Sequence, residues 1–126
     1  MSKDKRIFDL EERLIEFAVR IIRIAESLPK IKAGNHISGQ LIRCGTSPAP
    51  NYGEAQGAES RSDFIHKMKV CLKELRETKV WLIMIVRANL IKQKSKLEPD
   101  INENDELISI FMTSIKTAKQ NQGKRS

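Results

Sequence analysis

The sequence predicts an all-α protein: an antiparallel, up-down bundle of four helices in which prolines kink the second helix. Apolar residues recur at steps of three and four along most of the chain, which is the spacing of one helix face. Aromatic residues make up only 5% of the 126 residues, and β-branched runs bounded by turn signals are scarce. This length suits a single domain over residues 1–126, which we expect to be ordered from about residue 8 to residue 120.

The first helix is predicted to run from about Asp9 to Leu28. Asp9 is the expected N-cap, because a short side chain with a free oxygen accepts hydrogen bonds from the first backbone amides. Pro29 ends the helix, since the residue before a proline is pushed out of the helical region. The apolar stripe consists of Leu10, Leu14, Phe17, Ile21, Ile24 and Leu28.

The second helix follows a loop over residues 30–34 and is expected to be capped by Asn35 or Ser38. Pro48 and Pro50 then interrupt it, because proline lacks a backbone donor and clashes with the preceding turn. Its glycines are poor helix formers, so its helicity has to come from packing. These glycines are Gly39, Gly45, Gly53 and Gly57.

Three polar residues around the proline break are expected to have structural roles. Ser47 is predicted to bond backbone groups that the prolines leave free, and Asn51 to cap the resumed helix through its side-chain oxygen. Glu54 is predicted to be a buried anchor for a basic side chain, either Arg43 or Arg76, because an unpaired buried carboxylate is costly. The alternative for Glu54 is a solvated position on a helix face.

The third helix is predicted to start from a cap at Ser60 or Ser62 and to reach about Asn89. Its apolar positions alternate steps of four and three, which is typical of bundle packing. These positions are Phe64, Met68, Cys71, Leu75, Thr78, Leu82, Ile85 and Asn89. Residues 80–86 are apolar all round, so a second surface, most simply another subunit, is expected to cover their outer side. The residues predicted at this subunit interface are Val80, Trp81, Ile83 and Val86.

The fourth helix is predicted from Asn102 or Asn104 to about Lys119, after a lysine-rich connection that ends at Pro99. Its apolar stripe consists of Leu107, Ile108, Phe111, Ile115 and Ala118. The last residues, 120–126, are polar and are expected to be disordered.

Positive charge is concentrated in the second half of the chain. The net charge is +7, and residues 61–126 carry fourteen Lys and Arg against eight Asp and Glu, whereas residues 1–60 carry nine against eight. This asymmetry favours an anionic partner, most often nucleic acid, over the alternative of a solvated lysine face. The predicted nucleic-acid-binding residues are Arg61, Lys67, Lys69, Lys73, Arg76, Arg87, Lys92, Lys94, Lys96, Lys116 and Lys119. In an up-down bundle, the start of the third helix and the end of the fourth share one end and form a basic rim.

The residues that enzymes and metal sites need are scarce. The two histidines, His36 and His66, have no acid or nucleophile at a spacing that suggests catalysis or metal binding, so we expect no enzyme, no cofactor, no metal and no small-molecule substrate. Cys44 and Cys71 are interpreted as reduced packing residues. No signal peptide is visible and the longest apolar run has seven residues, so we expect no membrane partner and a cytoplasmic location.

Three segments resemble a known family. The segment Ser47-Pro-Ala-Pro-Asn-Tyr-Gly-Glu-Ala55 is similar to the signature of the four-helix-bundle family known as 23S rRNA intervening-sequence proteins, or S23 proteins. In that signature a serine precedes an asparagine by four residues, and a glutamate follows three residues later. Residues 63–82 resemble the family's third helix and residues 107–119 its last helix, so that the likeness covers about residues 10 to 120.

The resemblance implies a homopentamer with no known enzymatic activity. The family includes the accessory variability determinant proteins of diversity-generating retroelements, in which a basic pentameric barrel binds nucleic acid and a reverse transcriptase. We therefore expect an accessory protein that forms homo-oligomers and binds RNA or another nucleic acid. The alternative is a structural adaptor that binds another protein, such as a reverse transcriptase, without nucleic-acid binding of its own.

Overall fold

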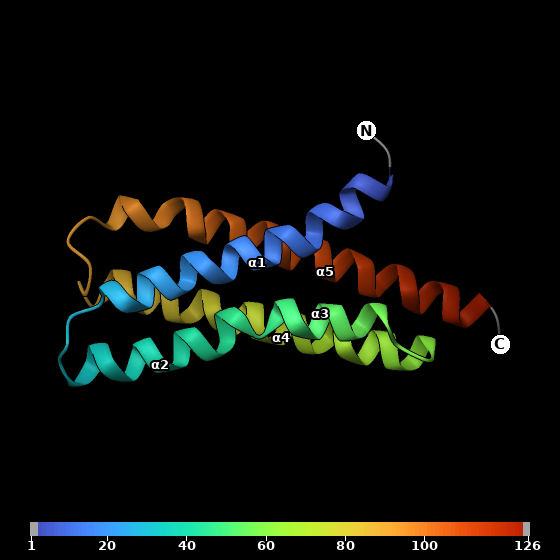
Figure 1. Cartoon of the computed structure of the whole chain (residues 1–126), viewed down its shortest axis with the longest axis horizontal. Helices are drawn as coiled ribbons and strands as arrows, with labels where there is room; N and C mark the ends of the chain where they lie inside the picture. The colour runs from blue at the N-terminus through green and yellow to red at the C-terminus, as the bar shows by residue number, and fades with distance from the viewer. Residues whose placement is uncertain (1–2, 125–126) are drawn as a thin grey trace.

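The structure is a computed structural model that describes residues 3–124, with side chains for residues 10–122. Over residues 3–124 it contains five α-helices and one short 3-10 helix and no strand, which confirms the prediction of an all-α bundle (Figure 1). The elements are α1 (Lys3–Ser27), α2 (Lys32–Thr46), α3 (Pro48–Gln56), α4 (Arg61–Arg87), η1 (Lys94–Leu97) and α5 (Glu98–Lys124).

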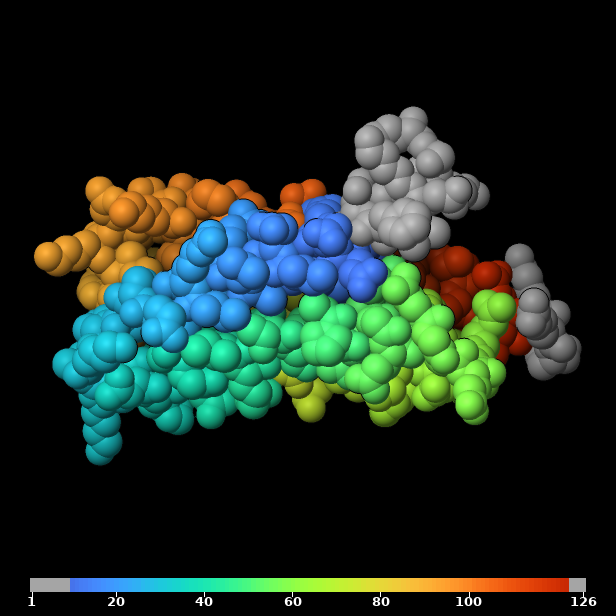
Figure 2. Space-filling view, in the orientation of Figure 1, coloured from blue at the N-terminus to red at the C-terminus, as the bar shows by residue number. Residues whose placement is uncertain are grey.

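The helices lie side by side as four rods, because α2 and α3 follow one another along the same side of the bundle (Figure 1). Residues 28–31 and residues 88–93 connect helices at one end, and residues 57–60 connect helices at the other. Helix α1 packs beside α2, α3 and α5, whereas α4 packs beside α2, α3 and α5. Within the described residues α1 and α4 make no close backbone approach, so they occupy opposite corners. Figure 2 shows that α1, α2 and α3 together form the face of the bundle turned toward the viewer, with α1 lying along α2 and α3.

Helix α1 begins earlier than predicted. It starts at Lys3, so Asp9 lies inside the helix and its prediction as the N-cap was wrong; the Asp9 side chain is outside the described residues. The helix ends at Ser27, before Pro29, as predicted. The predicted stripe is confirmed by the buried side chains of Leu14, Phe17, Ile21, Ile24 and Leu28.

The turn between α1 and α2 is tighter than predicted. Helix α2 begins at Lys32 after the N-cap residue Ile31, which makes no side-chain cap. Asn35 and Ser38 therefore lie within the helix, and neither is its cap. The backbone itself closes the turn, because the Ile31 amide donates to the Pro29 carbonyl oxygen at 2.9 Å and the Asn35 amide to the Ile31 carbonyl oxygen at 2.8 Å.

The proline break is only one residue long. Ser47 separates α2 from α3 and itself has helical torsion angles, φ −64° and ψ −38°. Pro48 and Pro50 lie in the first turn of α3, where backbone amides have no partner within the helix and a proline costs little. The predicted interruption is therefore present but short.

Helix α4 begins at its predicted cap. The Ser60 hydroxyl oxygen accepts a hydrogen bond from the Asp63 amide at 3.0 Å. Ile65 is buried at the start of the helix, where Phe64 was predicted and is only half-buried. Asn89 is exposed rather than in the core, and its left-handed φ of 56° turns the chain away after the helix. The remaining predicted core positions are buried: Met68, Cys71, Leu75, Thr78, Leu82 and Ile85.

Helix α5 is longer than predicted at both ends. It begins at Glu98 because η1 leads directly into it and Pro99 fits its first turn. Residues 120–124 continue the helix, so the predicted disorder there was wrong; residues 125–126 are outside the described residues. Leu107, Phe111, Ile115 and Ala118 are buried as predicted, and Ile108 is half-buried.

Ion pairs connect neighbouring helices and fix their relative heights. Those between α1 and α5 are Arg13–Glu103 at 2.7 Å, Arg13–Glu106 at 3.8 Å and Arg20–Asp100 at 3.3 Å. The others are Arg43–Glu74 at 3.1 Å and Arg43–Glu77 between α2 and α4, Lys67–Glu54 at 3.1 Å between α4 and α3, and Lys79–Asp105 at 2.8 Å between α4 and α5.

Candidate nucleic-acid interface

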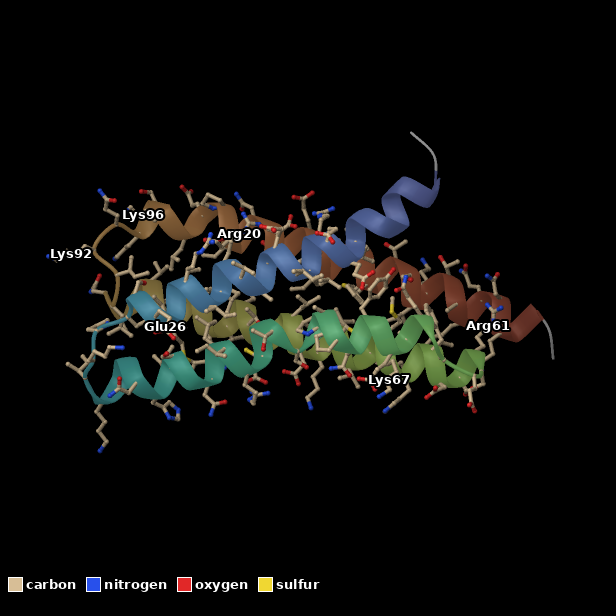
Figure 3. The ribbon with its side chains drawn as sticks, in the orientation of Figure 1. Arg20, Glu26, Arg61, Lys67, Lys92 and Lys96 are labelled. Carbon is tan, nitrogen blue, oxygen red and sulfur yellow. The ribbon has the colours of Figure 1, made fainter. Side chains whose placement is uncertain are left out.

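Several of the predicted basic residues lie toward one or the other end of the bundle. Figure 3 shows Lys92 and Lys96 at the end where α4 leads to α5, and Arg61 and Lys67 at the other end. Lys92 and Lys96 line a surface hollow of about 850 Å³ beside Ser27 and Pro29. At the same end the exposed side chains also include Arg87 and Lys94.

Four lysines form a cluster where α4 and α5 run side by side, which we call the α4–α5 basic cluster: Lys69 and Lys73 of α4 with Lys116 and Lys119 of α5. The Lys119 side chain contacts Lys69 and, through that contact and through charge repulsion, lowers the pKa of the Lys69 ammonium. The Lys79–Asp105 ion pair joins the same two helices further along, so Lys73 and Lys116 lie between the two cross-links. All four side chains are exposed.

No ion pair neutralises the cluster among the described residues. None of its four lysines forms an ion pair there, in contrast to Lys67 and Lys79, which pair with Glu54 and Asp105. Lys67 was predicted to bind nucleic acid, but its ammonium is already paired and its side chain is 29% exposed. Uncompensated like charges held together are the electrostatic footprint of an anion-binding surface.

Two other predicted residues lie beside this cluster. Arg76 is exposed on α4, one turn beyond Lys73, and makes no ion pair within the described part of the chain. Arg61 is half-buried and lines a hollow of about 430 Å³ with Glu59, Ser60 and Ala118. The carboxylate of Glu59 in that hollow makes Arg61 the weaker candidate of the two.

The prediction that Glu54 is a buried anchor was wrong. Helix α3 buries Tyr52 and Ala55, which places position 54 on the outer side. The Glu54 side chain is 59% exposed and accepts a hydrogen bond from the Lys67 ammonium at 3.1 Å.

The anchor that joins the second and third predicted helices is a different acid. Arg43 donates to the 8%-exposed Glu74 at 3.1 Å and also to Glu77. Desolvation opposes the charge on Arg43, but the two carboxylates outweigh it and raise the pKa of the guanidinium. The burial of Glu74 could have been predicted from the sequence. Glu74 lies one helical turn before Thr78, which is in the buried stripe, and therefore on the buried side of the helix.

Ser47 and Asn51 bond to each other across one turn, which differs from their predicted roles. The Asn51 side-chain amide donates to the Ser47 carbonyl oxygen at 3.0 Å and to its hydroxyl oxygen at 2.9 Å. Asn51 therefore acts as a donor inside α3 rather than as its cap. Ser47 serves as an acceptor at the junction rather than bonding free backbone groups.

The predicted interface residues divide between two sides of α4. Val80 is 50% exposed and Ile83 half-buried, and the exposed Met84, which was not predicted, lies next to them. Trp81 and Val86 pack against the core instead. The Trp81 and His36 rings meet edge to face, with 5.9 Å between their ring centroids. The Trp81 indole nitrogen donates a hydrogen bond to the Glu77 carboxylate at 3.0 Å.

Among the described residues, no three His, Cys, Asp or Glu side chains lie together in an arrangement that could hold a metal ion. None of the described helices is both long and apolar enough to cross a membrane.

Native Cys44 and Cys71 are expected to resist iodoacetamide at pH 8. Both are buried free thiols, and burial raises the pKa of each, for Cys71 to about 12. The reactive thiolate of Cys71 is then roughly one part in 10,000 at pH 8 and increases as the pH approaches 12. Mass spectrometry should find both cysteines unlabelled in the native protein and labelled in 6 M guanidinium. Fast labelling of the native protein would contradict the burial.

Comparison with known proteins identifies the family. The model of the family described as 23S rRNA-intervening sequence protein matches residues 8–110. A crystal structure of a protein with unknown function, from the S23 ribosomal protein family of Bacteroides thetaiotaomicron, has a TM-score of 0.79 and 34% sequence identity, covering 85% of this chain and 98% of that one. Among curated proteins none matches. These findings confirm the resemblance in the sequence, and the chain belongs to the family of 23S rRNA-intervening sequence proteins.

Proposed function

We propose that this protein is a non-enzymatic accessory factor of the cytoplasm that binds RNA or another nucleic acid through the α4–α5 basic cluster. It acts as a homo-oligomer, for which the family resemblance suggests five copies. The frame is an antiparallel up-down bundle, kinked in its second helix at Pro48. The observation that carries the proposal is that four exposed lysines lie on neighbouring stretches of α4 and α5 and form no ion pair with a described residue. The side chain of Lys119 lowers the pKa of Lys69, which is consistent with their closeness.

A phosphate backbone fits this cluster electrostatically. A bound phosphate stabilises the protonated form of Lys69 against the repulsion from Lys119, and each neutralised phosphate releases condensed counterions. The cluster contains no aromatic side chain on which bases could stack, so recognition falls on the backbone and tolerates different sequences. RNA is the first candidate because the family is named for 23S ribosomal RNA.

Reversing the charge of Lys69 and Lys119 together (Lys69→Glu, Lys119→Glu) is expected to weaken RNA binding at least tenfold. The variant loses two phosphate contacts, so the slope of log K against log salt decreases by about 1.4 for a single strand. Fluorescence anisotropy of a labelled single-stranded RNA, measured at several salt concentrations, gives both quantities. A second RNA of unrelated sequence should give the same result.

The matched control carries the same charge change at the other end of the bundle, as Lys92→Glu with Lys96→Glu. Its affinity and salt slope should change less than those of the cluster variant, because only the non-specific attraction falls. Equal losses in the two variants would remove the cluster from the proposal. A wild-type protein that does not bind RNA even at low salt would favour the protein-binding adaptor, such as a partner of a reverse transcriptase.

A further inference from the structure

Helix α1 presents an exposed apolar row with acids at its ends, here called the α1 stripe. Ile15 and Ile22 are 41% and 40% exposed, and Glu12 and Glu26 are exposed on either side of them. Neither acid forms an ion pair with a described residue, and one cation, Arg23, lies next to the row. Figure 3 shows Glu26 on the side of α1 away from Arg20, which points toward α5.

Helix α4 presents an exposed apolar row with cations at its ends, here called the α4 stripe. Val80 and Met84 are 50% and 43% exposed, and Arg76 and Arg87 are exposed before and after them. Within the described residues, neither arginine forms an ion pair. The spacing of four, four and three residues places all four side chains on the helix face opposite the core.

We propose that the α1 stripe of one copy of this chain packs against the α4 stripe of another. Both stripes have an apolar centre, and their ends carry opposite charges, so the pairing covers the exposed side chains and matches the charges at once. Glu12 and Glu26 are about 21 Å apart along α1, and Arg76 and Arg87 about 16 Å apart along α4, a difference that long arginine side chains can absorb. The inference rests on the homo-oligomer of the proposed function.

The positions of the two helices make this contact head-to-tail. Helices α1 and α4 occupy opposite corners of the bundle, so their outer faces point away from each other and one copy cannot pair its own stripes. Pairing α4 with α4 would instead oppose arginine with arginine. A head-to-tail contact between unlike faces repeats from copy to copy and closes into a ring or continues as a filament. Lys69 lies on the same face of α4, seven residues or about 10 Å before Arg76, so it lies beyond the end of the α4 stripe and stays accessible to nucleic acid.

Charge reversal on either stripe is expected to break the assembly, and reversal on both to restore it. The first variant carries Glu12→Lys and Glu26→Lys, the second Arg76→Glu and Arg87→Glu, and the third all four changes. Light scattering should give the oligomer mass for the wild type and for the third variant, and at least a tenfold weaker association for the first two. A control with Glu59→Lys and Lys94→Glu, both exposed outside the stripes, should keep the wild-type mass.

Two outcomes separate this inference from the proposed function. An oligomeric wild type whose mass survives both single-stripe reversals overturns the stripe pairing and leaves the homo-oligomer standing. A wild type that is still monomeric at about 100 µM protein overturns the homo-oligomer and the inference with it. A specific interface should have a dissociation constant well below that concentration. Circular dichroism checks that each variant stays helical. If one unfolds, glutamine variants at the same positions of that stripe replace it and must still weaken the association.

Discussion

Replacing Gly34 with alanine is expected to lower the free energy of unfolding by about 2 kcal/mol, although alanine is normally the better helix residue. Gly34 is buried in the first turn of α2, where an added methyl group would overlap the Pro29 carbonyl oxygen. That oxygen belongs to the backbone of the turn between α1 and α2, so it moves only if the turn itself moves. Urea unfolding followed by circular dichroism measures the effect.

Gly39 provides the matched control five residues further along the same helix. It is exposed, and an added methyl group would meet nothing within 4 Å. Gly39→Ala should therefore raise the free energy of unfolding by about 0.5–1 kcal/mol, the ordinary gain in helix propensity. If both variants shift stability in the same direction, the tight turn at Pro29 does not constrain the helix.

Most of the core could be predicted from spacing alone, because burial repeats with the helical period. Phe17, Ile21 and Leu75 lie in stripes that the sequence predicted and are 0% exposed. Helix ends were less predictable. Asn35 has the right chemistry for a cap, but the Ile31 carbonyl oxygen already receives its amide one turn into α2. A cap depends on where the preceding turn ends, which local sequence does not determine.

The candidate site was predictable in composition but not in arrangement. The sequence indicated that lysines of the third and fourth predicted helices share one end, and the structure places Lys69 against Lys119. The sequence did not indicate that Lys67 forms an ion pair, because that pair depends on which face of α3 carries Glu54. To predict an ion pair between two helices, one must know how far the helices are shifted relative to each other along the bundle axis. The periodicity of the sequence predicts only which face of each helix is buried.

A polar residue in the centre of the core leads to the last prediction. Asn104 is 0% exposed, and neither its amide nitrogen nor its amide oxygen has a hydrogen-bond partner among the residues that the structure describes. It lies on the buried side of α5 between Asp100 and Leu107. A buried polar group without a partner loses its hydration and gains nothing in return, so this position reduces stability.

Asn104→Leu is expected to raise the free energy of unfolding by about 1–3 kcal/mol, because leucine has as many side-chain heavy atoms and no polar atom to desolvate. Asn102→Leu is the control: Asn102 is exposed on the same helix, and its variant should stay within about 0.5 kcal/mol of the wild type. Urea unfolding compares the three proteins. RNA binding should not change in either variant, because neither residue touches the α4–α5 basic cluster. A loss of stability in Asn104→Leu would mean that Asn104 makes a hydrogen bond that the bundle needs.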